Sequence, residues 1–166
     1  MDKKEYIVTA FTENQVGVLN RITATYLRRK INIESLRVAE SSIKGISMFV
    51  ITAITSHDTI EKVVKHIAKI VEVLDVKYYT SAELITQEVA LYKISKGVFE
   101  NESANELITR NQSARVIEFG SDYVVVEQTG SRDDIEKFKQ TLQDKNLLLQ
   151  YSSSGSVIIH RENIKF

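Results

Sequence analysis

The residues with the clearest chemical potential lie in the stretch Glu13–Leu19, with the sequence Glu-Asn-Gln-Val-Gly-Val-Leu. It follows an apolar run, Tyr6–Phe11, and opens a segment whose apolar residues recur with helical spacing. A helix N-terminus presents unpaired backbone N–H groups and partial positive charge, which suit a carboxylate or a phosphate. Gly17 lacks a Cβ, so a ligand can approach its backbone, and Asn14 offers both a donor and an acceptor.

Purely structural roles for these residues remain open as alternatives. Asn14 also favours an Asx turn or a helix cap, and Gly17 also favours a tight turn. A second polar segment, Asn32–Leu36, has a similar ambiguity, because Asn32 suits local backbone hydrogen bonds and Leu36 suits a core position.

Catalytic constellations are sparse in the rest of the chain. His57, His66 and His160 are scattered, without the spacing of metal ligands. The sequence has no Walker-type phosphate loop, no Gly-x-Gly-x-x-Gly and no Gly-x-Ser-x-Gly elbow. Cysteine is absent, which excludes thiolate metal sites and cysteine nucleophiles.

Composition places the 166-residue chain among ordinary globular proteins. Its 22 Lys+Arg and 22 Asp+Glu give a formal net charge of zero, which argues against a nucleic-acid or anionic-membrane binder. The apolar run near the N-terminus is too short for a signal peptide or a membrane span. We therefore expect a soluble, cytoplasmic protein.

The element order of the first half carries more information. Apolar spacing and turn residues predict strand, helix, strand, strand, helix and strand, in that order. The corresponding ranges are Tyr6–Phe11, Val18–Lys30, Ile31–Ala39, Ile46–Ile54, Asp58–Val71 with Asp58 as the cap, and Val73–Thr80. This order is the split βαβ, or ferredoxin-like, motif.

The second half repeats this order more weakly. Its predicted elements are the strand Thr86–Ile94, the helix Ser103–Asn111, the strands Arg115–Phe119 and Tyr123–Gln128, a helix from Ser131 to Leu142, and the strands Leu147–Tyr151 and Ser156–His160. We therefore predict an α+β fold of two ferredoxin-like βαββαβ units, residues 1–80 and 81–166. The first half carries 12 Lys+Arg and 9 Asp+Glu (+3), and the second carries 10 and 13 (−3).

Two motifs together resemble the regulatory small subunit of acetolactate synthase, also called acetohydroxyacid synthase. They are Glu13-Asn14-x-x-Gly17-Val18-Leu19-x-Arg21 and Asn32-Ile33-Glu34-Ser35-Leu36. The segment Ile67–Val76 is similar to the second helix and fourth strand of that family's amino-acid-binding ACT domain. Arg110–Glu118 and Thr129-Gly130 are similar to its C-terminal domain. The sequence departs from the family pattern at Val16, where a small or polar residue is usual, and at Ser152–Gly155, where an Arg-Thr-Gly-like turn is common.

The resemblance implies an ACT regulatory domain at residues 1–80 and a second small α/β sandwich domain, of the small-subunit type, at residues 81–166. It also implies a subunit without an active site. Such a subunit binds and activates a large catalytic subunit and confers feedback inhibition by valine or another branched-chain amino acid. Thiamine diphosphate, Mg²⁺ and FAD would belong to that partner, and this chain would hold no cofactor or metal of its own.

In this family the ACT domains form a side-by-side homodimer. The effector lies between the loop of one subunit and the second strand of its neighbour. Carried over by motif, backbone N–H groups at Gly17–Leu19 hold the α-carboxylate, asparagine oxygens accept from the ammonium group, and Ile33 selects a branched side chain. The implied effector-binding residues are Asn14, Gln15, Gly17, Val18, Leu19, Asn32 and Ile33.

Two other functions remain alternatives. One is a stand-alone amino-acid-sensing ACT protein without an enzyme partner. The other is an acylphosphatase-like hydrolase, because Gln15–Arg21 resembles the phosphate loop of that family. The glutamine is displaced by one residue, and Asn20 stands where an aromatic residue is expected.

Overall fold

The computed structural model describes residues 3–99, 106, 108, 111 and 113–161, which form two compact units. The first comprises the chain up to Ile85 together with the segment from Ile158, and the second is Thr86–Val157. This division differs from the expected units 1–80 and 81–166. The first unit extends five residues further and regains a segment from the C-terminal end of the chain, because Leu84 and Ile158 pack on its sheet.

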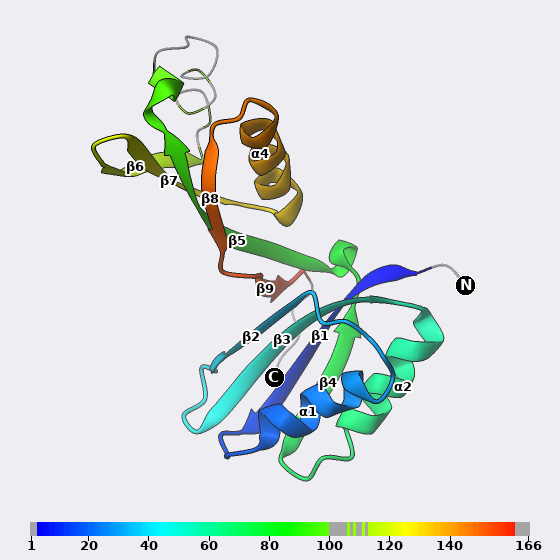
Figure 1. Cartoon of the computed structure of the whole chain (residues 1–166). Helices are drawn as coiled ribbons and strands as arrows, with labels where there is room; N and C mark the ends of the chain where they lie inside the picture. Colours follow the sequence, from blue (N-terminus) through cyan, green and yellow to red (C-terminus); the bar gives the residue numbers. More distant parts are fainter. Residues whose placement is uncertain (1–2, 100–105, 107, 109–110, 112, 162–166) are drawn as a thin grey trace. The chain divides into compact units, whose positions relative to one another are not determined.

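The first unit has the predicted βαββαβ order (Figure 1). Its four strands lie in the order β2-β3-β1-β4, and each neighbouring pair is antiparallel. The bounds are β1 Lys4–Glu13, α1 Val18–Leu27, β2 Ser35–Glu40, β3 Ile46–Thr55, α2 His57–Ile67 and β4 Val73–Tyr79. Strand β2 is therefore an edge strand.

Both helices pack on one face of this sheet, because side chains alternate along each strand. In the central pair, β1 and β3, the register places Tyr6, Val8 and Ala10 opposite Ala53, Ile51 and Phe49 on that face. The helices complete the core with residues spaced three and four apart, as the predicted apolar stripes require. These residues are Val18, Ile22 and Tyr26 of α1 and Ile60, Val63 and Ile67 of α2.

Several element boundaries in this unit differ from expectation. Helix α1 ends at Leu27 rather than Lys30, so the three cations follow its last turn, and α2 ends at Ile67 rather than Val71. The second strand begins at Ser35 rather than Ile31, because Ile31 and Ile33 pack against the core from a loop before the strand. The residue that caps α2 is Ser56, in an extended conformation, rather than Asp58. Asp58 lies in the first turn instead, where a carboxylate complements the positive end of the helix dipole.

The opposite face of the same sheet carries a smaller apolar cluster. Ile7 and Val50 contact Leu84, which follows the short helix η1 (Ser81–Glu83), and Ile158 of strand β9 (Val157–His160). The rings of Tyr79 and His160 meet edge to face, with centroids 4.5 Å apart. Strand β9 pairs with β5 (Leu84–Ser95), so the last described strand helps to cover the N-terminal unit.

The second unit repeats the topology of the first. Its strands lie in the order β6-β7-β5-β8, which corresponds to β2-β3-β1-β4. The bounds are η2 Lys96–Phe99, β6 Ala114–Phe119, β7 Tyr123–Gly130, α4 Arg132–Asp144 and β8 Leu148–Ser153. The helix start expected at Ser131 is confirmed, because its side chain accepts from the Asp134 N–H as an N-cap. The predicted helix Ser103–Asn111 lies largely outside the described residues.

A buried tyrosine connects the sheet of this unit to its helix. The Tyr92 hydroxyl lies 2.9 Å from Gln128 Oε1 and 3.0 Å from the Ile135 carbonyl oxygen, and it donates to these acceptors. Burial raises the pKa of Tyr92.

Replacing Tyr92 by phenylalanine is expected to lower the free energy of unfolding by about 1–3 kcal/mol, because the buried Gln128 amide loses its partner. Urea denaturation measures the change. The matched control is Tyr151→Phe, which keeps a ring that packs on Tyr92 and removes a hydroxyl that takes no part in the described Tyr92, Gln128 and Ile135 network. Equal stability of the two variants would contradict the prediction.

Candidate functional site

The predicted effector loop connects the end of β1 to the start of α1. Gly17 is the N-cap residue of α1, with φ of 90° and ψ of −13°, a left-handed conformation that favours glycine. Its carbonyl accepts from the Arg21 N–H at 3.1 Å. A Cβ placed on Gly17 would have no atom within 4 Å, so the backbone here is open to an approaching ligand.

The start of α1 has no side-chain cap. Asn14 therefore does not cap this helix, which removes one of the two alternatives considered for it. The first N–H groups of a helix lack intrahelical partners, and a ligand carboxylate can accept from them. The loop thus presents a helix N-terminus without a capping side chain, and of its first donors the Val18 N–H makes a long hydrogen bond of 3.5 Å to the Gln15 carbonyl.

The side chains of the loop differ in their orientation. Val18 is only 2% exposed and belongs to the core, so it can contribute to a ligand site only through its backbone. Leu19 and Asn14 are exposed, and Val16 is fully exposed. The Gln15 amide is turned towards Glu13, where Nε2 donates to Oε2 at 2.7 Å.

Three backbone segments are joined at this end of the unit. The Asn14 N–H donates to the Gly45 carbonyl at 3.0 Å, and the Glu13 N–H donates to the Glu72 carbonyl at 2.9 Å. The Glu72 carboxylate also pairs with Arg21 of α1, with Nη2 2.7 Å from Oε1. The loop, the β2–β3 turn and the α2–β4 turn are therefore mechanically connected.

The other half of the predicted site lies elsewhere in the chain. Asn32 and Ile33 precede β2, whereas Asn14 bonds to Gly45 in the turn that follows β2. Six residues of strand, about 20 Å at 3.3 Å per residue, separate the two ends of β2. Asn32 Nδ2 donates to Glu34 Oε1 at 3.1 Å, and Ile33 packs against the core. One chain does not bring the two halves together.

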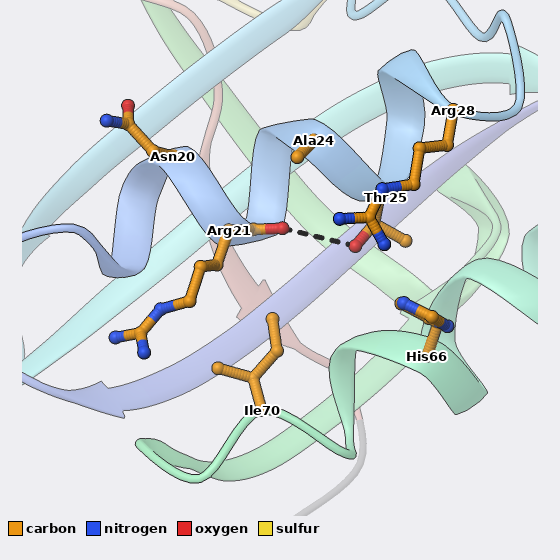
Figure 2. A pocket seen from close by; sticks show the side chains of 7 residues that line it. All are labelled: Asn20, Arg21, Ala24, Thr25, Arg28, His66 and Ile70. Carbon is orange, nitrogen blue, oxygen red and sulfur yellow. Dashed lines mark hydrogen bonds between the residues drawn. The ribbon is translucent and has the colours of Figure 1, made fainter.

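A groove of about 290 Å³ lies between α1 and α2 (Figure 2). Its lining residues are Asn20, Arg21, Ala24, Thr25, Arg28, His66 and Ile70. Neither Arg28 nor His66 is a predicted ligand-binding residue. The available signal was the run Arg28-Arg29-Lys30, but a run of cations near a helix end is common for electrostatic reasons alone.

The described residues offer little to acid–base or metal chemistry. Among them, no group of three His, Asp or Glu residues could hold a metal ion. Arg21, which a phosphate loop would need, pairs with Glu72. Burial raises the pKa of Tyr26, but that side chain lies in the core rather than in the groove or the loop. Among the described residues, none of the helices has the length and hydropathy of a membrane span.

Comparisons with known proteins match both halves of the chain. Residues 9–75 match the family described as AHAS small subunit-like ACT domain, and residues 87–162 match the family described as small subunit of acetolactate synthase. The acetolactate synthase small subunit of Bacillus subtilis is 30% identical over 138 residues, covering 82% of this chain and 80% of that protein.

Two further comparisons extend over nearly the whole chain. The acetolactate synthase small subunit of Aquifex aeolicus is 29% identical over 159 residues, covering 96% of this chain and 82% of that protein. The crystal structure of the acetolactate synthase small subunit of Thermotoga maritima superposes with a TM-score of 0.83 at 27% identity. That superposition covers 97% of this chain and 99% of the Thermotoga chain.

Proposed function

Because the chain belongs to the family of acetolactate synthase small subunits, we propose that it activates a catalytic acetolactate synthase subunit and makes it sensitive to a branched-chain amino acid. The chain acts as a regulatory subunit and does no chemistry itself. Thiamine diphosphate, Mg²⁺ and FAD are bound by the catalytic partner. Valine is the effector that we propose first.

The observation that carries the effector proposal is the uncapped N-terminus of α1 at Gly17. An amino acid has a carboxylate, which the N–H groups of Gly17–Leu19 can hold, and an ammonium group, which needs acceptors such as the Asn14 amide oxygen. Leu19 and Val16 provide exposed apolar surface beside this loop for an aliphatic side chain.

The position of β2 supports a homodimer that completes this site. Strand β2 is at the edge of its sheet, with Leu36 and Val38 partly exposed on the helix side. An edge strand offers unpaired backbone groups to a partner strand. If β2 pairs with β2 of a second copy, the two strands run in opposite directions. The end of β2 that follows Asn32 in one copy then lies beside the end of β2 that precedes Gly45 in the other. Asn14 bonds to Gly45, so this arrangement brings the two halves of the predicted site together.

Reconstitution tests the proposal. Adding the purified chain to its cognate acetolactate synthase catalytic subunit is expected to raise the rate of acetolactate formation severalfold. Valine is expected to inhibit the mixture and to leave the catalytic subunit alone unaffected. Unchanged rate and unchanged valine response would contradict the regulatory role. Valine binding in calorimetry without any effect on the catalytic subunit would favour the stand-alone sensor.

The same calorimetry, extended to leucine and isoleucine, identifies the effector. A methylene group in an apolar pocket changes binding by about 1–3 kcal/mol, so the affinity for valine is expected to differ measurably from those for leucine and isoleucine, which are isomers and differ from each other only in shape.

A further inference from the structure

The outer surface of α1 and α2 carries an excess of positive charge. Residues 18–30 contain four Lys or Arg and no Asp or Glu. Lys62 lies one turn before His66 on α2, and Ile70 follows the end of that helix; His66 and Ile70 line the groove. This surface therefore concentrates the positive charge of the N-terminal half on one side of the unit.

Two basic side chains in or beside the groove already have partners. Arg21 pairs with Glu72 at 2.7 Å. Arg29 joins the two helices, with Nη1 donating to the Thr25 carbonyl at 3.2 Å and Nη2 to the Lys62 carbonyl at 3.4 Å. Arg28 is exposed, and its guanidinium has no ion-pair or hydrogen-bond partner among the described residues.

The shape of the groove favours a side chain over a large ligand. Its volume of about 290 Å³ lies at the lower end of the range for small-molecule sites. Ala24 and Ile70 provide an apolar floor, while Arg28 and His66 lie at one end and Arg21 lies at the other (Figure 2). A carboxylate side chain fits this arrangement, because its stem packs on the floor and its oxygens accept from Arg28 in a bidentate pair.

The groove also adjoins the proposed effector loop. Asn20 and Arg21 line it, and they directly follow Leu19. Glu72 connects the two features, since its carboxylate binds Arg21 and its carbonyl accepts from Glu13 at the start of the loop. A ligand that displaces the loop would therefore shift Arg21 and change the shape of the groove. Such a link between two sites is the coupling that allosteric control requires.

We propose that the α1–α2 groove is a docking surface for an acidic segment of the catalytic subunit, with Arg28, at one end of the groove, binding a carboxylate of that segment. This inference rests on the proposed function, which supplies the partner. Charge complementarity favours an acidic segment, because the surface is basic and the Arg28 guanidinium lies beside an apolar floor. The catalytic subunit is the expected source of this segment, because it must respond to the state of the adjoining loop.

The test is charge reversal in the full-length chain, with affinity for the purified catalytic subunit measured at two salt concentrations. Arg28→Glu is expected to weaken binding at least tenfold and to reduce its salt dependence. Lys62→Glu, one turn before the groove residue His66 on α2, is expected to act in the same direction. The matched control is Lys4→Glu, which makes the same change of net charge at an exposed position at the start of β1. The control is expected to change affinity less than threefold.

Valine calorimetry on each variant alone separates this surface from the effector site, and unchanged valine affinity also shows that the variant is folded. Equal affinities of the Arg28→Glu and Lys4→Glu variants for the catalytic subunit would overturn the docking surface and leave the proposed function intact. Failure of the unaltered chain to bind the catalytic subunit would overturn the proposed function and this surface with it.

Discussion

Replacing Gly17 by aspartate is expected to raise the valine concentration required for half-maximal inhibition at least tenfold. An aspartate side chain at the N-cap position accepts from the first N–H groups of α1, which are the groups that the effector carboxylate needs. Its negative charge also repels that carboxylate. A tenfold change corresponds to about 1.4 kcal/mol, within the range of interactions at a helix N-terminus.

The variant is expected to fold. A Cβ on Gly17 meets no neighbouring atom, so the cost is limited to the left-handed backbone, about 1–2 kcal/mol. Gly155→Asp is the control, because Gly155 also has a positive φ (71°) and lies outside the effector loop and β2. It carries the same strain without placing a carboxylate at a helix N-terminus. Inhibition curves of the reconstituted enzyme provide the measurement.

A second variant of the loop tests the ammonium contact. Asn14→Ala keeps the backbone hydrogen bond to Gly45 and removes only the amide, so it is expected to weaken valine inhibition while stability is retained. If Gly17→Asp and Asn14→Ala both titrate with valine like the unaltered chain, the effector site is not at this loop.

Replacing Ile158 by aspartate is expected to lower the free energy of unfolding of the N-terminal unit by about 3–5 kcal/mol. Ile158 is 8% exposed and packs with Ile7, Val50 and Leu84. A carboxylate in this cluster either remains buried without a partner or forces β9 to detach, which exposes the three apolar neighbours to water. Both routes cost stability, and urea denaturation measures the sum.

The adjacent residue supplies the control. Ile159 lies on the same strand and is 68% exposed, so Ile159→Asp introduces the same charge on the solvent side. Its effect is expected to stay within about 0.5 kcal/mol, as for most surface substitutions. Equal destabilisation by the two variants would show that β9 does not protect the sheet.

A chain ended at Thr80 lacks both Leu84 and Ile158 and is expected to show a comparable loss of stability.

The success of the element predictions has a physical cause. The apolar residues from Ile60 to Ile67 recur with helical spacing, so only a helix places them all on one buried face. The apolar, β-branched runs of β1 and β3 favour strands in the same way. The boundaries were less predictable. Ile31 and Ile33 alternate like strand residues, yet they pack from a loop, because contact with the core does not require strand pairing.

The resemblance of the loop motif and the Asn32–Leu36 motif identified the family before any contact was known. The individual roles depend on geometry that a motif does not encode. Val18 belongs to the motif, but its side chain enters the core, so only its backbone is available to a ligand. Arg28 lies outside the motif, and its proposed role follows from the contacts that Arg21 and Arg29 make with other groups.

The sequence by itself determined the order of elements in the first unit, the family and the position of the proposed effector loop, because these depend on local periodicity and on short motifs. The tertiary structure alone decided that β9 covers the N-terminal sheet, that Asn32 lies at the far end of β2 from Asn14, and that Arg28 borders a groove. These facts depend on pairings between segments distant in the chain. Contacts between distant segments contribute free energy only after the chain has folded, so they cannot be predicted from a local pattern of residues.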